Sequence, residues 1–358
     1  MKIHFAVGAR PNYMKVAPLI HLCKNYPKVS YRLLHTGQHY HRNLSALFFK
    51  DLELPKPNVN FSAGSHNRRD QIKIIRDRCV KYLKKEKPDL LVVVGDVNST
   101  LACALAAHRS GIFLAHVEAG LRSFDETMPE EKNRKETDKI SNILFTSCPD
   151  ANKNLINEGV DPRRIHFVGN IMIDSLKWGL QTIKHLQRPC GEPYALLTLH
   201  RPSNVDKKTN LKKIVDAINV ISRRITIFFP AHPRVFKSIR KFNIQIDPGI
   251  KMIEPLGYRQ FLNLLRYSNM TITDSGGLQE ETTYLGIPCI TLRENTERPI
   301  TVREGTNIIA GSHPDRIVKL ADNILRRKNC DRPRIKYWDG NTSKRIFKIL
   351  INRDKGDL

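Results

Sequence analysis

Short apolar runs rich in β-branched residues alternate with amphipathic stretches along the chain of 358 residues. The runs are apolar at consecutive positions, which is typical of strands covered by helices on both faces. Alternation of such strands with helical patterns predicts α/β domains with parallel sheets. The expected strands are residues 3–7, 31–35, 90–94, 113–117, 143–146, 165–168, 195–199, 225–229, 251–253, 270–273 and 288–291. The clearest helical patterns are residues 12–24, 100–109, 211–223 and 277–285.

The pattern weakens in residues 178–194, which include the Pro- and Gly-containing segment 188–193. Because Pro and Gly interrupt helices and strands, we place a domain boundary there. The sequence therefore predicts two Rossmann-like, doubly wound domains, residues 1–178 and 193–335, and a terminal segment, residues 336–358, with a helix near 341–351. We expect the two domains to face a central cleft at the carboxyl ends of their strands, where ligands of such folds usually bind.

The composition, 40% apolar and 27% charged, is that of a globular protein. No apolar run approaches the roughly 18–20 residues that cross a membrane. The N-terminus reads as a buried strand, so we expect a cytoplasmic protein that does not bind membranes. The seven cysteines are odd in number and lack a C-x-x-C pair, which argues against disulfides and thiolate zinc sites.

The charge is strongly positive: 60 Lys and Arg against 35 Asp and Glu give +25. Such a field attracts polyanions, so a nucleic-acid-binding protein is one candidate class. The basic residues are dispersed, however, and sit at the polar positions of helical patterns, for example in residues 81–87 and 326–328. We interpret them as solvated helix faces and expect no nucleic-acid partner.

The candidate chemistry of the first domain follows the predicted strands. Gly8 ends the first strand, and Arg10 and Lys15 flank the start of the next helix, an arrangement suited to a phosphate. The G-x-G-x-x-G fingerprint is absent there, which argues against NAD. Asp96 ends another strand, where it could cap the following helix or take part in chemistry; the sequence leaves both readings open.

The densest polar cluster is residues 116–123, followed by a pair of acids at the start of a helix. Neighbouring carboxylates push one another's pKa values apart, which gives one site both a proton donor and a base. Glu118 is therefore a candidate for catalysis. Glu130 and Glu131 have a second explanation, since acids favour the positive end of a helix.

In the second domain, His200 and His232 each follow a predicted strand, and Ser275, Gly276 and Gly277 open a helix. Glycines at a helix start let a phosphate reach the backbone N–H groups. Glu281, one turn further on, could accept hydrogen bonds from ribose hydroxyls. The guanidinium groups of residues 293 and 298 could clamp a diphosphate. The histidines are too dispersed for a metal site, so we expect none.

Taken together and in this order, the motifs resemble those of the non-hydrolysing UDP-N-acetylglucosamine 2-epimerases. They are residues 8–11 (GARP), 35–39 (HTGQH), 95–96 (GD), 116–122 (HVEAGLR), 129–134 (PEEKNR), 274–281 (DSGGLQEE) and 296–299 (TERP). The resemblance implies a glycosyltransferase-B-like pair of domains, with the last helix returning to the first domain. It also implies interconversion of UDP-GlcNAc and UDP-ManNAc by a homodimer, without a cofactor.

The resemblance also assigns residues to roles. It implies Asp96, Glu118 and Glu130 as catalytic carboxylates, with His200 and Arg10 in the active site. It implies that UDP is bound by Ser275, Gly276, Gly277 and Glu281, with Phe261 near the uracil. We add Lys15, His232 and Arg298 as candidate substrate-binding residues. A possible second, activating UDP-GlcNAc site would include Gln38, His39 and Arg122.

One motif departs from the family pattern, because residues 201–204 (RPSN) replace a common Arg-Glu-Asn. Two related activities stay open: a hydrolysing epimerase that releases ManNAc and UDP, and a 2-epimerase of a UDP-diacetamido uronic acid. The C2 hydrogen of N-acetylglucosamine is not flanked by a carbonyl, so no enolate can stabilise its removal. We therefore expect elimination of UDP to a 2-acetamidoglucal and re-addition, with Asp96 and Glu118 transferring protons.

Overall fold

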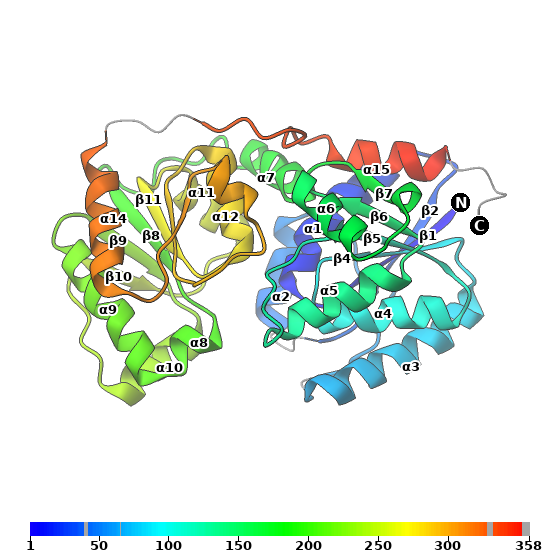
Figure 1. Cartoon of the computed structure of the whole chain (residues 1–358), viewed down its shortest axis with the longest axis horizontal. Helices are drawn as coiled ribbons and strands as arrows, with labels where there is room; N and C mark the ends of the chain where they lie inside the picture. Colours follow the sequence, from blue (N-terminus) through cyan, green and yellow to red (C-terminus); the bar gives the residue numbers. More distant parts are fainter. Residues whose placement is uncertain (39–41, 65, 328–331, 353–358) are drawn as a thin grey trace. The chain divides into compact units, whose positions relative to one another are not determined.

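The computed structural model describes residues 1–38, 42–64, 66–327 and 332–352. The chain divides into two compact units. Unit 1 comprises Met1–Trp178 and Lys336–Leu358, and unit 2 comprises Gly179–Ile335. Each unit is built on one parallel sheet covered by helices (Figure 1). The predicted α/β class with two parallel sheets is therefore confirmed.

The sheet of unit 1 has seven strands in the order β3-β2-β1-β4-β5-β6-β7. Strand order reverses between β1 and β4, so the chain segments that leave these two strands diverge at a topological switch point, the usual ligand site of such sheets. The strands are β1 (Lys2–Val7), β2 (Ser30–His35), β3 (Val59–Asn60), β4 (Leu90–Val94), β5 (Phe113–Ala119), β6 (Ile143–Thr146) and β7 (Ile165–Phe167).

Helices cover both faces of this sheet, with α3, α4 and α5 on one side and α15 on the other (Figure 1). β4 is buried along its whole length, as its unbroken apolar sequence predicts. The alanine-rich α4 lets α3 pack close to it, which buries Cys79 and Leu83 of α3 completely. The helices are α1 (Arg10–Cys23), α2 (Arg42–Asp51), α3 (Arg68–Glu86), α4 (Asn98–Arg109), α5 (Pro129–Ile140), α6 (Pro149–Asn157), α7 (Ile171–Thr182), α15 (Thr342–Ile351) and the 3-10 turn η1 (Pro162–Arg164).

The last helix, α15, is anchored on unit 1 by a buried carboxylate. Asp174 on α7 accepts hydrogen bonds from the N–H groups of Thr342 (3.1 Å) and Ser343 (2.7 Å), at the start of α15. An acid in this position satisfies N–H groups that have no partner inside the helix. Tyr26 stacks on Phe347 of α15, with ring centroids 5.3 Å apart. These contacts hold α15 against α7 and the segment that follows α1.

The sheet of unit 2 has six strands in the order β10-β9-β8-β11-β12-β13, with its switch point between β8 and β11. Figure 1 shows α9 and α14 on one face of this sheet and α11 and α12 on the other. The strands are β8 (Tyr194–Thr198), β9 (Thr226–Pro230), β10 (Ile250–Ile253), β11 (Met270–Thr273), β12 (Cys289–Thr291) and β13 (Asn307–Ile309). The helices are α8 (Pro202–Val205), α9 (Lys208–Ser222), α10 (Pro233–Phe242), α11 (Tyr258–Arg266), α12 (Gly276–Leu285), α13 (Ile300–Arg303) and α14 (Pro314–Arg326).

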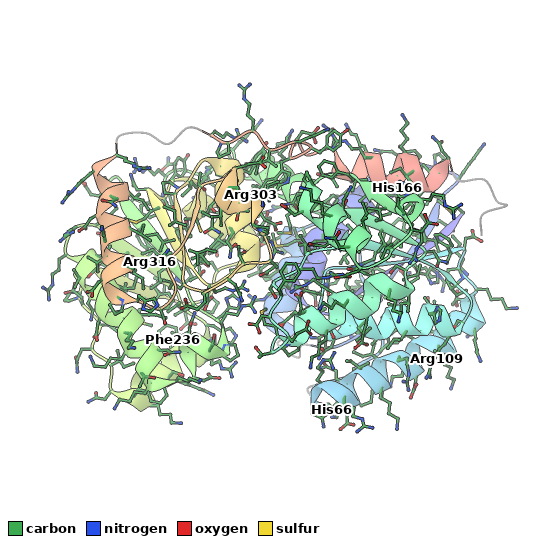
Figure 2. The ribbon with its side chains drawn as sticks, viewed as in Figure 1. His66, Arg109, His166, Phe236, Arg303 and Arg316 are labelled. Atoms are coloured by element: carbon green, nitrogen blue, oxygen red, sulfur yellow. The ribbon has the colours of Figure 1, made fainter. Side chains whose placement is uncertain are left out.

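Basic side chains are spread over the helices of both units. Arg109 at the end of α4, Arg303 on α13 and Arg316 on α14 are all exposed (Figure 2). This dispersal agrees with solvated helix faces. In the described part of the chain, no helix combines the length and the apolar character that a membrane crossing requires.

Candidate active site

Glu118 lies at the end of β5 in an unusual backbone conformation. Its φ is +71°, in the left-handed region that a residue with a side chain rarely adopts. The pairing of β5 with β6 shifts register between Val117 and Ala119, so Glu118 occupies a β-bulge, a device that redirects a side chain. Its carboxylate is bound to the ammonium of Lys15 on α1, and both side chains are buried. Burying two charges is tolerated only when they are well paired, so this pair is tightly constrained.

Gly95 brings β4 against this pair. Its φ is +68°, and a Cβ there would lie 2.8 Å from Lys15 Nζ and 3.4 Å from Glu118 Oε2. Only glycine both adopts this positive φ readily and leaves room for the Lys15 ammonium. Asn12 ties the loop after β1 to the same place: its amide donates to the carbonyl of Val94 (2.9 Å) and its Oδ1 accepts from Gly8 N–H (3.0 Å). The ends of β1, β4 and β5 therefore meet at the switch point.

Asp96 follows Gly95 and is held by α5. Its carboxylate is bound to the guanidinium of Arg134, and its carbonyl accepts a hydrogen bond from the Asn133 amide (2.8 Å). Arg134 is itself buried and pairs with Glu131 (2.6 Å). The Asp96 side chain keeps 24% of its surface exposed, against 4% for Glu118. One carboxylate is therefore open to a ligand while the other is enclosed.

The remaining predicted residues of unit 1 lie around this edge. Glu130 is half-buried in the first turn of α5, and Arg10 is exposed at the start of α1, with its guanidinium 5.6 Å from the centre of the Phe48 ring. Gln38 is buried, and its side-chain oxygen accepts hydrogen bonds from the N–H (3.0 Å) and hydroxyl (2.6 Å) of Ser99.

Arg122 is buried and bound to Glu158 (2.6 Å) and Asp138 (2.8 Å). His39 lies outside the described residues. The activator role assigned to Gln38, His39 and Arg122 stays a prediction, and the two described side chains already have partners inside unit 1.

In unit 2, a buried carboxylate orients the predicted histidine. Asp274 ends β11 and accepts hydrogen bonds from the N–H groups of His200 (3.1 Å) and Arg201 (3.0 Å). His200 Nδ1 lies 2.8 Å from Asp274 Oδ1, while about half of the His200 side chain (49%) is exposed. Burial acts to raise the pKa of Asp274, but His200 and the N–H donors outweigh it and the pKa is lowered. An imidazole held in this way presents its other nitrogen in a fixed direction.

The start of α12 carries the predicted phosphate-binding residues. Ser275 is its N-cap residue, and Gly276 and Gly277 form its first turn. A Cβ on Gly276 would lie 2.5 Å from Arg298 Nη1 and 2.6 Å from Glu297 Oε1, so this glycine gives room to a buried ion pair. Arg298 also binds Glu280 of α12, with its Nε 3.0 Å from the carboxylate. Arg298 is thus already neutralised by two acids at this helix start.

Glu281 is buried one turn into α12. Burial, with the neighbouring charge of Glu280, raises the pKa of Glu281 to about 8, so this carboxyl group is protonated at neutral pH. Its Oε1 is enclosed and has no hydrogen-bond partner among the described residues. A buried polar atom without a partner is unfavourable, and a ligand hydroxyl that reached it would satisfy it.

Two further predicted residues lie on neighbouring helices. Phe261 is half-buried on α11, and His232 is the N-cap of α10, where its Nδ1 accepts a hydrogen bond from Arg234 N–H (3.2 Å). Among the described residues, no cluster of three or more His, Cys, Asp or Glu side chains could hold a metal ion.

The sequence analysis gave no role to Arg134 and Asp138, and for Glu131 it left open a place at the helix start. All three are buried on α5, at spacings of three and four residues. Charged residues at helical spacing in a helix with few apolar residues are the signal that could have revealed them, because such a helix must bury polar groups. Their partners, however, come from distant segments and depend on the fold.

Two parallel α/β units with polar groups at the carboxyl ends of their strands define the glycosyltransferase-B-like class. Within that class the model of the UDP-N-acetylglucosamine 2-epimerases matches residues 21–351. The chain belongs to this epimerase family, as the motifs predicted, and it is an enzyme of the isomerase class.

Three relatives place it more closely. A UDP-N-acetylglucosamine 2-epimerase of Methanococcus maripaludis is 41% identical, over 99% of each chain. The crystal structure of Methanocaldococcus jannaschii UDP-GlcNAc 2-epimerase, in complex with UDP-GlcNAc and UDP, is similar with a TM-score of 0.91 and 40% identity, over 99% of this chain and 100% of the other. A UDP-2,3-diacetamido-2,3-dideoxy-D-glucuronate 2-epimerase of Pseudomonas aeruginosa is 36% identical, over 98% of this chain and 99% of the relative.

Proposed function

We propose that this protein interconverts UDP-N-acetylglucosamine and UDP-N-acetylmannosamine by reversible epimerisation at C2, without NAD or a metal. The observation that carries the proposal is the pair of carboxylates at the switch point of unit 1, Glu118 and Asp96, in a chain that matches epimerases along its whole length. Both acids occur at strand ends, where the backbone fixes their directions.

The reaction proposed is an elimination followed by an addition. A base removes the proton from C2 while the C1–oxygen bond to UDP breaks, which leaves a 2-acetamidoglucal and UDP. The diphosphate oxygen then adds back to C1, and an acid protonates C2 on the opposite face. No electrons pass to an oxidant, so the step balances with the substrate alone. Acid–base catalysis of this kind contributes about 10²–10⁴-fold to rate.

The two units have different parts in this reaction. Glu118 and Asp96 transfer the protons, with Glu130 in support, because they lie together at one strand edge. In unit 2, the start of α12 holds the diphosphate and Glu281 meets the ribose. Phosphate binding at a helix start uses N–H groups that lack partners within the helix. His200 belongs to the same proposal as a catalytic residue. Roles in binding the substrate are proposed for Arg10, Lys15, His232, Phe261 and Arg298.

Incubation with UDP-GlcNAc in deuterated water tests the proposal. We expect chromatography to resolve UDP-ManNAc, and mass spectrometry to find deuterium at C2 of the product. Release of free ManNAc and UDP would identify a hydrolysing enzyme instead. Epimerisation without deuterium at C2 would exclude proton transfer with solvent and with it the elimination mechanism.

A second substrate follows from the relative in Pseudomonas aeruginosa, whose name specifies a UDP-diacetamido uronic acid. At 36% identity that enzyme shares the family with this chain. A competition assay that supplies both nucleotide sugars distinguishes the two substrates, and we expect preference for UDP-GlcNAc.

We also expect the protein to form a homodimer in solution, which light scattering after gel filtration measures. A cytoplasmic location stays a prediction.

A further inference from the structure

A buried carboxylate outside the proposed acid–base pair contacts the chain on both sides of Glu118. Asp138 lies on α5 and is 1% exposed. Its Oδ1 lies 2.6 Å from His116 Nδ1, and its Oδ2 accepts a hydrogen bond from Gly120 N–H at 3.1 Å. His116 and Gly120 are the residues two before and two after Glu118. The two oxygens of one carboxylate therefore span the β-bulge in which Glu118 sits.

The second link runs from His116 to the other proposed acid. His116 Nε2 lies 2.8 Å from the carbonyl oxygen of Gly95, the residue that precedes Asp96. A carbonyl only accepts, so this nitrogen carries a proton and donates it. The His116 ring is fully buried and bound at both nitrogens, which leaves it one orientation. The His116 ring thus fixes the carbonyl of Gly95, whose φ is +68°. This sets the direction in which the chain enters Asp96.

Asp138 is itself held in place. The guanidinium of Arg122 lies 2.8 Å from Asp138 Oδ2 and binds Glu158 through a second pair of contacts, at 2.6 and 2.7 Å. Burial acts to raise the pKa of Asp138, but the neighbouring His116 and Arg122 outweigh it, so the pKa is lowered and the group is ionised. A charged acceptor of this kind forms short, strong hydrogen bonds.

The left-handed backbone of Glu118 explains why such support is needed. Conformations of this type persist only where the surroundings impose them. We propose that Asp138, acting through His116 and Gly120, is a positioning residue that fixes the directions of both Glu118 and Asp96. The inference rests on the proposed function, since it concerns the two acids that transfer protons there.

Steady-state kinetics of Asp138→Ala test the proposal against a matched control. Loss of a hydrogen-bond partner that orients a metal-bound side chain typically lowers activity by about 10–100-fold, and we take the same range for an oriented acid. We expect a fall of that size in kcat, with KM changed less than threefold and UDP affinity by calorimetry unchanged. Asp138→Asn keeps a hydrogen-bonding group at each position and should retain an intermediate kcat. His116→Phe removes the contact to Gly95 and should lower kcat as Asp138→Ala does.

Asp174→Ala is the control, because Asp174 is a buried carboxylate of the same unit that caps α15. It should lower the melting temperature and leave kcat within twofold. Values of kcat within twofold of the wild type in every folded variant of Asp138 and His116 would overturn the positioning role. So would failure of all three variants to fold while Asp174→Ala folds, since the pair would then be part of the structural core. A wild-type protein that makes no UDP-ManNAc would instead refute the proposed function.

Discussion

The switch points of the two sheets carry acidic groups in opposite surroundings. In unit 1, Glu118 and Asp96 are bound to Lys15 and Arg134, so each negative charge is balanced by a positive one. In unit 2, Asp274 at the end of β11 is likewise paired, with His200, but Glu281, one turn into α12, is buried and forms no ion pair among the described residues, and burial raises its pKa to about 8. Both edges thus carry acids with close partners, and unit 2 adds a buried acid that is protonated at neutral pH.

The backbones at the two edges differ as well. Unit 1 uses left-handed conformations at Glu118 (φ +71°) and at Gly95 (φ +68°), which set the directions of the Glu118 side chain and of the chain entering Asp96. Unit 2 uses an ordinary extended N-cap, Ser275 (φ −86°), followed by a regular helix. Transfer of a proton needs a group aimed within hydrogen-bond distance, whereas phosphate recognition needs only free N–H groups at a helix start. The difference supports the proposed division between proton transfer in unit 1 and nucleotide binding in unit 2.

The largest expected effect follows from removing an acid of unit 1. Glu118→Gln or Asp96→Asn should lower kcat by about 10²–10⁴-fold, the usual contribution of a general acid or base. Calorimetry should find unchanged affinity for UDP, because the nucleotide is assigned to unit 2. Asp161→Asn is the control, since Asp161 is a surface acid of unit 1 that pairs with Arg163. If both variants turned over at the wild-type rate, Glu118 and Asp96 would not be the catalytic acids.

A substitution at the start of α12 tests the other side of the comparison. Gly276→Ala places a methyl group 2.5 Å from Arg298 Nη1 and must displace the Arg298–Glu297 pair. We expect UDP affinity to fall by about tenfold or more, equivalent to about 1.4 kcal/mol. Gly191→Ala in the same unit is the control, because a Cβ there has no described atom within 4 Å. Equal UDP affinity in the two variants would show that α12 does not hold the phosphates.

The protonated state of Glu281 has a consequence for stability. The ordinary pKa of a glutamate is 4.5 and the folded value is about 8, so the folded protein binds more protons than the unfolded chain between these values. The free energy of unfolding therefore falls as pH rises through this window, by an amount on the order of a few kcal/mol. Glu281→Gln, which does not titrate, should lose less melting temperature between pH 5 and pH 8.5. Parallel curves for the two proteins would show that Glu281 is ionised.

The sequence predicted most of the fold because its strands are buried on both faces. The expected strand 90–94 is β4, and the expected helix 277–285 begins one residue late. The strands β3 and β13 were not predicted, since they are two and three residues long and their apolar runs are too short to stand out. Short strands are specified by the neighbours they pair with, which a local pattern does not contain.

The candidate site was predicted unevenly for the same reason. Acids at strand ends, such as Asp96, follow directly from the alternation of strands and helices, which places strand ends on one edge. The partners Arg134 and Asp138 lie on α5 and are joined to β4 and β5 only by the fold. Lys15, which the sequence placed beside a phosphate, is bound to Glu118 in the structure. A role in binding the substrate stays a prediction for it.

The smallest effect is expected at His4, a buried residue away from the strand ends that carry the two candidate sites. His4 lies near the amino end of β1, fully buried, and neither ring nitrogen has a hydrogen-bond partner among the described residues. Burial, with the charges of Lys2 and Arg32, lowers its pKa from 6.5 to about 4. Between these values the unfolded chain binds more protons than the folded protein, so the free energy of unfolding falls as pH decreases from 6.5 to 4.

His4→Phe removes both the titration and the unsatisfied polar atoms, whose burial costs about 1–3 kcal/mol. It should therefore raise the melting temperature at pH 5 more than at pH 7.5, and leave kcat unchanged because His4 is remote from the carboxyl end of the strand. If His4→Phe melts at a lower temperature than the wild type at both pH values, the buried histidine does not cost stability at this position.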